Sequence, residues 1–164
     1  MMSVDAETLR HAMRQWASGV SIVTARHAEH QHGMTVNSFI SVSLNPPLVL
    51  VSLERGRHTH ELVERSGYFG VSILSDQHKE ISERFAGRAT ETGDRFACLE
   101  TFRLVSDTPL LSEALAALDC RVVERHPAGT HTLFIGEVMA VQNQEGGSPL
   151  LYFNQAYRKL KDGG

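Results

Sequence analysis

Short apolar runs separated by turn-forming residues, rather than long helices, limit how this chain can fold. The stretch from Met34 to Leu44 is the clearest example, because apolar and polar side chains alternate along it. A strand places successive side chains on opposite faces of a sheet, so the two kinds of side chain separate. We expect one face to join the core, and its apolar members are Met34, Val36, Ile40, Val42 and Leu44.

The same pattern predicts further strands. They lie at 20–24, 48–53, 68–74, 119–126, 130–142 and 150–153. The polar run 28–33 is predicted to be a hairpin turn, and the apolar run 48–53 suits a strand buried on both faces. About six strands at hairpin spacing, with helices as connectors, favour an antiparallel barrel over a parallel doubly wound sheet.

Four helices are expected between and before these strands. Asp5 can cap the first, and Leu9, Met13 and Trp16 would share the face that packs on the core. The others are expected at 59–66, at 76–86, and from Ser112 to about residue 118. The stretch 87–108 is expected to be irregular.

Composition narrows the class of protein. A chain of 164 residues with 41% hydrophobic content predicts one domain over 1–164. A net charge of -3 without a basic stripe excludes a nucleic-acid partner. No segment resembles a signal peptide or a membrane span, so we expect a soluble, cytoplasmic protein. Cys98 and Cys120 are far apart and fit neither a disulfide framework nor a zinc site.

The nucleotide-binding loops of common folds are missing. The chain has no G-x-G-x-x-G and no G-x-x-x-x-G-K-[ST], so any nucleotide must be held differently. A metal-binding reading rests on histidines without strong ligand spacing, and an exposed polar turn also explains them. These are His27, His30, His32, His58 and His60.

Two segments are candidate binding sites. The polar face of the 34–44 strand, which includes Thr35 and Asn37, offers small hydrogen-bonding groups suited to a planar heteroaromatic ring. The same alternation is also typical of an ordinary solvent-facing strand. Arg57, His58 and Thr59 precede a helix, where free N–H groups favour a phosphate. A plain N-cap with solvated charges explains that segment equally.

Several blocks of the sequence resemble one known family. The run Gly-Met-Thr-Val-Asn-Ser-Phe at 33–39 and the run Ser-Val-Ser-Leu-Asn-Pro-Pro-Leu-Val at 41–49 carry most of the likeness. It continues at 16–20, 71–75, 84–86, 118–120, 131–138 and 149–153. These blocks, in this order, are similar to the short-chain flavin reductases, which include reductase components of two-component monooxygenases such as that for 4-hydroxyphenylacetate.

The resemblance implies a fold and an activity. The fold is a mainly β, six-stranded antiparallel Greek-key split barrel of the FMN-binding type, flanked by helices and assembled as a homodimer. The activity is hydride transfer from NADH or NADPH to FAD or FMN. The reduced flavin then diffuses to a separate oxygenase. The alternative is a flavin-binding split barrel without reductase turnover, which would not need a nicotinamide pocket.

The resemblance also implies roles for particular residues. Those bordering the flavin would be Thr35, Val36, Asn37, Ser38, Ser52, Leu53, Arg57, His58, Thr59, Arg84 and Phe85. Those beside the nicotinamide would be His131, Tyr152, Phe153 and Tyr157. No catalytic acid or base and no metal is implied, because hydride transfer depends chiefly on positioning two rings.

Overall fold

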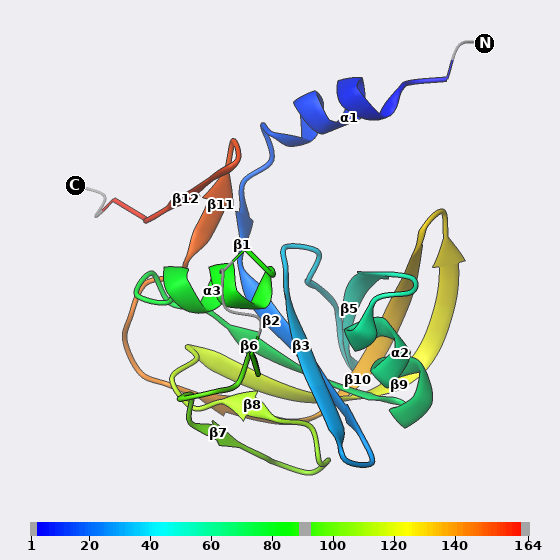
Figure 1. Ribbon diagram of the computed structural model, residues 1–164, viewed down its shortest axis with the longest axis vertical. Coiled ribbons are helices and arrows are strands. Elements are labelled where there is room, and N and C mark those ends of the chain that lie inside the picture. Colours follow the sequence, from blue (N-terminus) through cyan, green and yellow to red (C-terminus); the bar gives the residue numbers. More distant parts are fainter. Residues whose placement is uncertain (1–2, 89–92, 162–164) are drawn as a thin grey trace.

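A curled antiparallel sheet makes up most of the molecule (Figure 1). The computed structural model describes residues 3–88 and 93–161. The sheet has seven strands in the order β3-β2-β6-β9-β10-β5-β4. Their bounds are β2 (Ser21–His27), β3 (His30–Val36), β4 (Ile40–Leu44), β5 (Pro47–Glu54), β6 (Tyr68–Ile73), β9 (Ala116–Ala128) and β10 (His131–Asn143).

The remaining elements are short. A small sheet joins β1 (Ser18–Gly19), β11 (Leu151–Phe153) and β12 (Ala156–Arg158), and β7 (Thr101–Phe102) pairs with β8 (Leu110–Leu111). The helices are α1 (Ala6–Met13), α2 (His58–Ser66) and α3 (Lys79–Phe85). None of the helices in the described part of the chain is long and apolar enough to span a bilayer.

The predicted fold class is confirmed, with one more strand in the main sheet than the six expected. All the strand pairs are antiparallel, and β2–β6 and β10–β5 join strands that are distant in sequence. The two edge strands, β3 and β4, follow one another in the chain but lie at opposite ends of the sheet order. The sheet therefore curls without closing between them.

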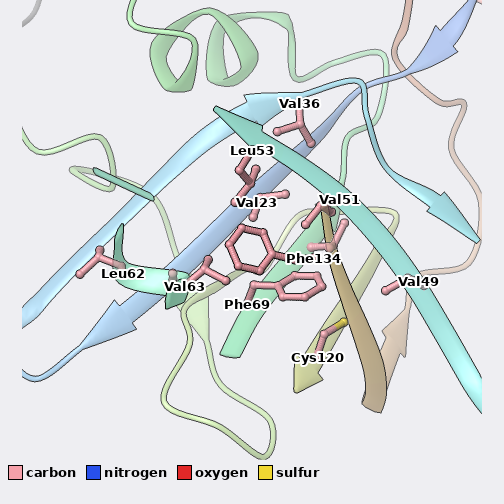
Figure 2. Close-up of a cluster of buried hydrophobic side chains, with 12 residues drawn as sticks. Val23, Val36, Val49, Val51, Leu53, Leu62, Val63, Phe69, Cys120 and Phe134 are labelled. Carbon is pink, nitrogen blue, oxygen red and sulfur yellow. The ribbon is translucent and has the colours of Figure 1, made fainter. Parts of the chain in front are cut away.

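The main core lies inside this curl (Figure 2). Phe69 of β6 and Phe134 of β10 are fully buried at its centre, and Leu62 and Val63 of α2 pack against the same cluster. Gly136 allows the close packing, because a Cβ there would lie only 2.5 Å from the ring of Phe69. The strand at 48–53 is not buried on both faces, since the alternate residues of β5 are only half-buried.

The prediction of one continuous strand from Met34 to Leu44 is wrong. Residues 37–39 leave the sheet between β3 and β4. The hydroxyl of Ser38 donates to the carbonyl oxygen of Ser52 at 2.9 Å and accepts from its N–H at 3.3 Å. The expectation that the apolar side chains beyond this break join the core is also wrong, because Ile40, Val42 and Leu44 are exposed.

Helix α1 stands away from the sheet (Figure 1). The predicted cap is confirmed, since the Asp5 carboxylate accepts from the N–H of Thr8 at 2.7 Å. The prediction that this helix packs on the core is wrong, because it has no buried residue. Leu9, Met13 and Trp16 are exposed by 56%, 54% and 70%. Within residues 3–88 and 93–161, nothing covers this amphipathic face of α1.

Three smaller expectations also differ from the structure. No helix begins at Ser112, because the chain there turns from β8 directly into β9. The predicted turn at 28–33 is a tight one at 28–29, and β3 already begins at His30. The stretch 87–108 includes the short strand β7 within its described residues, and 89–92 lie outside them.

Candidate functional site

Three adjoining hollows form a groove beside the end of β3. The middle hollow, of about 160 Å³, is lined by Val20, Thr35, Val36, Asn37, Ala86, Arg88, Tyr152 and Tyr157. The outer hollow, of about 490 Å³, shares Asn37 and Tyr152 with it and adds Ser38 and Trp16. The basic hollow, of about 540 Å³, shares Thr35, Ala86 and Arg88 and extends to the start of α2. A long ligand can therefore contact all three.

Hydrogen bonds to α3 fix the walls of the middle hollow. The hydroxyl of Thr35 donates to the carbonyl oxygen of Ser82 at 2.6 Å, and the Ser82 hydroxyl is 2.8 Å from the Tyr157 hydroxyl. The rings of Tyr152 and Tyr157 meet edge to face, with centroids 5.6 Å apart. A hydrogen bond to Tyr152 raises the pKa of Arg88, which keeps that guanidinium charged. The result is an aromatic wall opposite a polar strand end.

The residues expected along the flavin ring divide into two groups. Thr35 and Asn37 line the groove with polar side chains, and Asn37 is exposed. Ser38 lines the outer hollow, but its hydroxyl is already bonded to the backbone of Ser52. Val36 and Leu53 are buried in the core, so polar contacts from them would have to come from their backbone.

The start of α2 forms one wall of the basic hollow. Arg57 is the N-cap residue but makes no side-chain cap bond, and its Nε donates instead to Glu54 Oε2 at 2.7 Å. The hollow is lined by Arg57, His58 and Thr59 together with Glu54. The first N–H groups of a helix lack partners within it, and the helix dipole favours an anion beside them. This end of the groove therefore suits a phosphate.

Sequence analysis missed two residues that complete this hollow. Arg95 enters from a distant loop, and its Nη1 donates to the carbonyl oxygens of Gly33 and Phe85 at 2.9 and 2.8 Å. His32 lies in β3 rather than in an exposed turn, and its Nδ1 is 2.8 Å from the Thr59 hydroxyl. Extending the strand pattern of Met34 and Thr35 back across Gly33 would have found His32, but no local signal indicates Arg95.

His32 is neutral at pH 7. Burial, with added repulsion from the charges of Arg95 and His58, lowers the pKa of His32 from 6.5 to about 4. Its ring stacks on that of His58, with centroids 4.8 Å apart. In the described residues no group of three or more potential metal ligands is found. Of the histidines in the metal-binding interpretation, His27 lies opposite His30 across the β2–β3 hairpin, and His32 lies beside His58.

The residues expected at the flavin tail differ in position. Phe85 lines the basic hollow, is fully buried and meets Phe96 edge to face at 5.2 Å. A Cβ at Gly33 would lie 2.7 Å from this ring, so the glycine lets Phe85 pack against β3. Arg84 lies outside the three hollows, and its Nη1 donates to the carbonyl oxygen of Ala97 at 2.8 Å.

The four residues expected at the nicotinamide do not come together in this chain. Tyr152 and Tyr157 line the middle hollow, whereas Phe153 is absent from the linings of the three hollows. His131 opens β10 opposite Glu54, and its Nδ1 is 2.9 Å from the Thr130 hydroxyl. It therefore lies toward the basic end of the groove, away from the tyrosines.

Comparison with known proteins gives a consistent result. The family model described as "Flavin reductase like domain" matches residues 13–161. An NADH-dependent flavin reductase from Rhodococcus sp is 42% identical, over 93% of this chain and 85% of the relative. The reductase component of 4-hydroxyphenylacetate 3-monooxygenase from Thermus thermophilus is 38% identical, over 94% of this chain and 96% of the relative.

A solved structure supports the same relationship. The NADH:FAD oxidoreductase SgcE6 of Streptomyces globisporus, in complex with NAD and FAD fragments, superposes with a TM-score of 0.88. It is 29% identical, and the match covers 99% of this chain and 98% of that one. The family match spans nearly all the secondary structure from the end of α1 onward. This chain therefore belongs to the flavin reductase like domain family.

Proposed function

We propose that the protein is an NAD(P)H:flavin oxidoreductase that reduces FAD or FMN and supplies the reduced flavin to a partner monooxygenase. The observation that carries this function is the groove, in which a polar strand end with Thr35 and Asn37 faces the rings of Tyr152 and Tyr157. A flavin ring needs hydrogen bonds along its edge, and a second ring needs an apolar surface to lie against. The basic hollow then suits the phosphate.

The residues act by positioning. When both ligands are bound, the nicotinamide supplies a hydride to the flavin, and no proton donor from the protein is needed for that transfer. Thr35, held by its bond to Ser82, fixes one wall, and Tyr157, held by the same residue, fixes the other. Because these walls are already held in place, they would position a flavin and a nicotinamide ring against each other without first having to rearrange.

The openness of the groove supports a flavin that is released after reduction. Its hollows are shallow and border the edge of the sheet, rather than enclosing a ligand between two domains. The relative from Thermus thermophilus is named as the reductase component of a monooxygenase. By analogy, this chain would deliver reduced flavin by diffusion to a separate oxygenase.

Purified protein mixed with NADH or NADPH and free FMN or FAD tests this function. We expect nicotinamide oxidation that depends on added flavin and saturates with it, because the flavin exchanges at each turnover. The loss of nicotinamide absorbance, followed with and without oxygen, gives the rate. Flavin binding without nicotinamide oxidation would instead support a flavin-binding protein without reductase turnover.

We also infer a homodimer, from two apolar surfaces that the described part of the chain leaves exposed. One is on α1, where Leu9 and Met13 are exposed, and the other is on β4, where Ile40 and Leu44 are exposed. A helix as short as α1 is marginal in water without tertiary contacts, so a covering surface is required. A second copy offers both surfaces again in a symmetric arrangement.

Sedimentation of the wild type should give twice the chain mass of 18.2 kDa. Leu9→Glu and Ile40→Glu should each shift the protein toward the monomer, because a charge would be buried in the contact. Val105→Glu is the control, since Val105 is at least as exposed, by 65% against 56% for Leu9 and 57% for Ile40, and belongs to neither apolar surface. A wild-type monomer, or the same shift in all three variants, would contradict the inferred interface.

A cytoplasmic location is inferred from the two cysteines, which are both free. Cys98 is exposed, whereas burial raises the pKa of Cys120 to about 12 and makes its thiol unreactive. Free thiols are typical of reducing compartments. Recovery of the protein in the periplasmic or membrane fraction of its cell would count against this location.

Asn37→Leu should weaken flavin binding and leave the fold intact. The exposed amide is removed from the polar wall and replaced by an alkyl group, at a cost of about 1 to 3 kcal/mol of binding. Asn143→Leu, at the exposed end of β10, is the matched control. Fluorescence titration with flavin measures the affinity and thermal melting the stability. Equal flavin affinity in both variants would remove Asn37 from the site.

The nicotinamide contacts follow from the same groove. Tyr152 and Tyr157 wall the middle hollow, so we propose that the nicotinamide ring lies there, next to β11, the strand that also contains Phe153. His131 lies opposite Glu54, which lines the basic hollow. This position favours a contact between His131 and the pyrophosphate of NAD(P)H over one with the carboxamide.

His131→Ala should lower kcat/KM for the nicotinamide several-fold, which corresponds to a loss of about 1 kcal/mol of transition-state stabilisation. Flavin affinity should stay unchanged. His126→Ala is the control, because His126 is exposed on the same hairpin and pairs with Glu124 at 2.7 Å. Stopped-flow reduction of bound flavin over a range of NADH and NADPH concentrations gives the rates. Wild-type saturation in the His131 variant with both nucleotides would exclude this contact.

A further inference from the structure

The basic hollow contains a histidine whose polar environment is unusually constrained. His32 comes from β3, and its Nδ1 meets the hydroxyl of Thr59 at the start of α2 at 2.8 Å. Thr59 is fully buried, so its hydroxyl has no solvent-accessible surface through which to hydrogen-bond bulk water. The ring of His58 stacks on the ring of His32, with an angle of 28° between them. Two neighbouring residues of α2 therefore hold the imidazole in one orientation.

Hydrogen-bond accounting selects the tautomer of this imidazole. If Nδ1 carried the proton and donated to Thr59, the hydrogen of the buried hydroxyl would need an acceptor, and among the described residues only His32 is bonded to it. A buried donor without a partner is costly. Thr59 therefore donates to Nδ1. Because His32 is neutral at pH 7, its single ring proton lies on Nε2.

Two other donors of this hollow, Arg57 and Arg95, are already engaged within the protein. Arg57 pairs with Glu54 at 2.7 Å, and Nη1 of Arg95 is bonded to two backbone carbonyl oxygens. Their charges still attract an anion, but much of their hydrogen-bonding geometry is used within the protein. The imidazole of His32 lines the hollow with its Nε2–H not used by Thr59. This leaves it as a preoriented, neutral donor.

We propose that His32 is a specificity-determining residue, whose Nε2–H donates to the flavin phosphate and makes the enzyme prefer phosphorylated flavins to riboflavin. Thr59 is the positioning residue that fixes the required tautomer. The inference rests on the proposed function and deepens it. A neutral donor recognises the phosphate by geometry and adds no further positive charge, so the reduced flavin can still leave.

The test compares kcat/KM for FMN with kcat/KM for riboflavin, which share the ring and differ in the phosphate. His32→Phe keeps a ring for stacking but removes the donor, and should lower kcat/KM for FMN on the order of tenfold while leaving that for riboflavin unchanged. His32→Gln restores an N–H near the position of Nε2 and should recover most of the preference. The kcat/KM for FAD, which also carries phosphate, should change in the same direction as that for FMN.

Thr59→Val, which removes only the hydroxyl, should lower the FMN preference several-fold, again without affecting riboflavin. His30→Phe is the control, because His30 is exposed in the same strand. Nitrogen NMR of the wild type should report an unprotonated Nδ1 for His32. Thermal melting of each variant shows whether it is folded.

Parallel loss of activity with FMN and riboflavin in His32→Phe, or no change with either, would overturn the proposal. So would a proton on Nδ1. These failures differ from failure of the proposed function, in which the wild type would oxidise no nicotinamide with any flavin. A wild type that used riboflavin as well as FMN would keep the reductase function and reject the role of His32.

Discussion

The groove lies where the two edge strands of the main sheet, β3 and β4, do not pair with each other. The chain leaves the sheet after Val36, and the hydroxyl of Ser38 bonds both the N–H and the carbonyl oxygen of Ser52. The hydroxyl thus satisfies two backbone groups of β5 that a neighbouring strand would otherwise satisfy. The end of β3 remains open, and α3 and the tyrosines of the small sheet approach it. The middle and outer hollows border this opening, and the basic hollow joins it through Thr35.

The sequence pattern could predict the class of fold but not this opening. Alternation from Met34 to Leu44 stays in phase through the break, so a period of two cannot distinguish one long strand from two strands joined by a bend. The sequence also shows the apolar face of the first helix, but not what covers that face. Amphipathicity indicates that a face will be covered, but it does not say by which chain.

The site was predictable where its residues are neighbours in sequence. Thr35 and Asn37 lie together at one strand end, and Arg57 to Thr59 lie together at one helix start, so local patterns found them. Arg95 was not predictable, because it reaches the hollow through a long-range contact with the backbone of Gly33. The resemblance grouped His131 with Tyr157, but it gave no indication that the fold would place them apart.

Phe85 links the ligand site to the interior of the protein. Its ring lines the basic hollow and is also a fully buried member of the second core cluster, where it meets Phe96. A ligand in this hollow binds only the folded chain, because residues from separate elements form the hollow. Flavin concentration and resistance to heat are therefore thermodynamically coupled in this molecule, so that a cell depleted of flavin would hold a less durable enzyme.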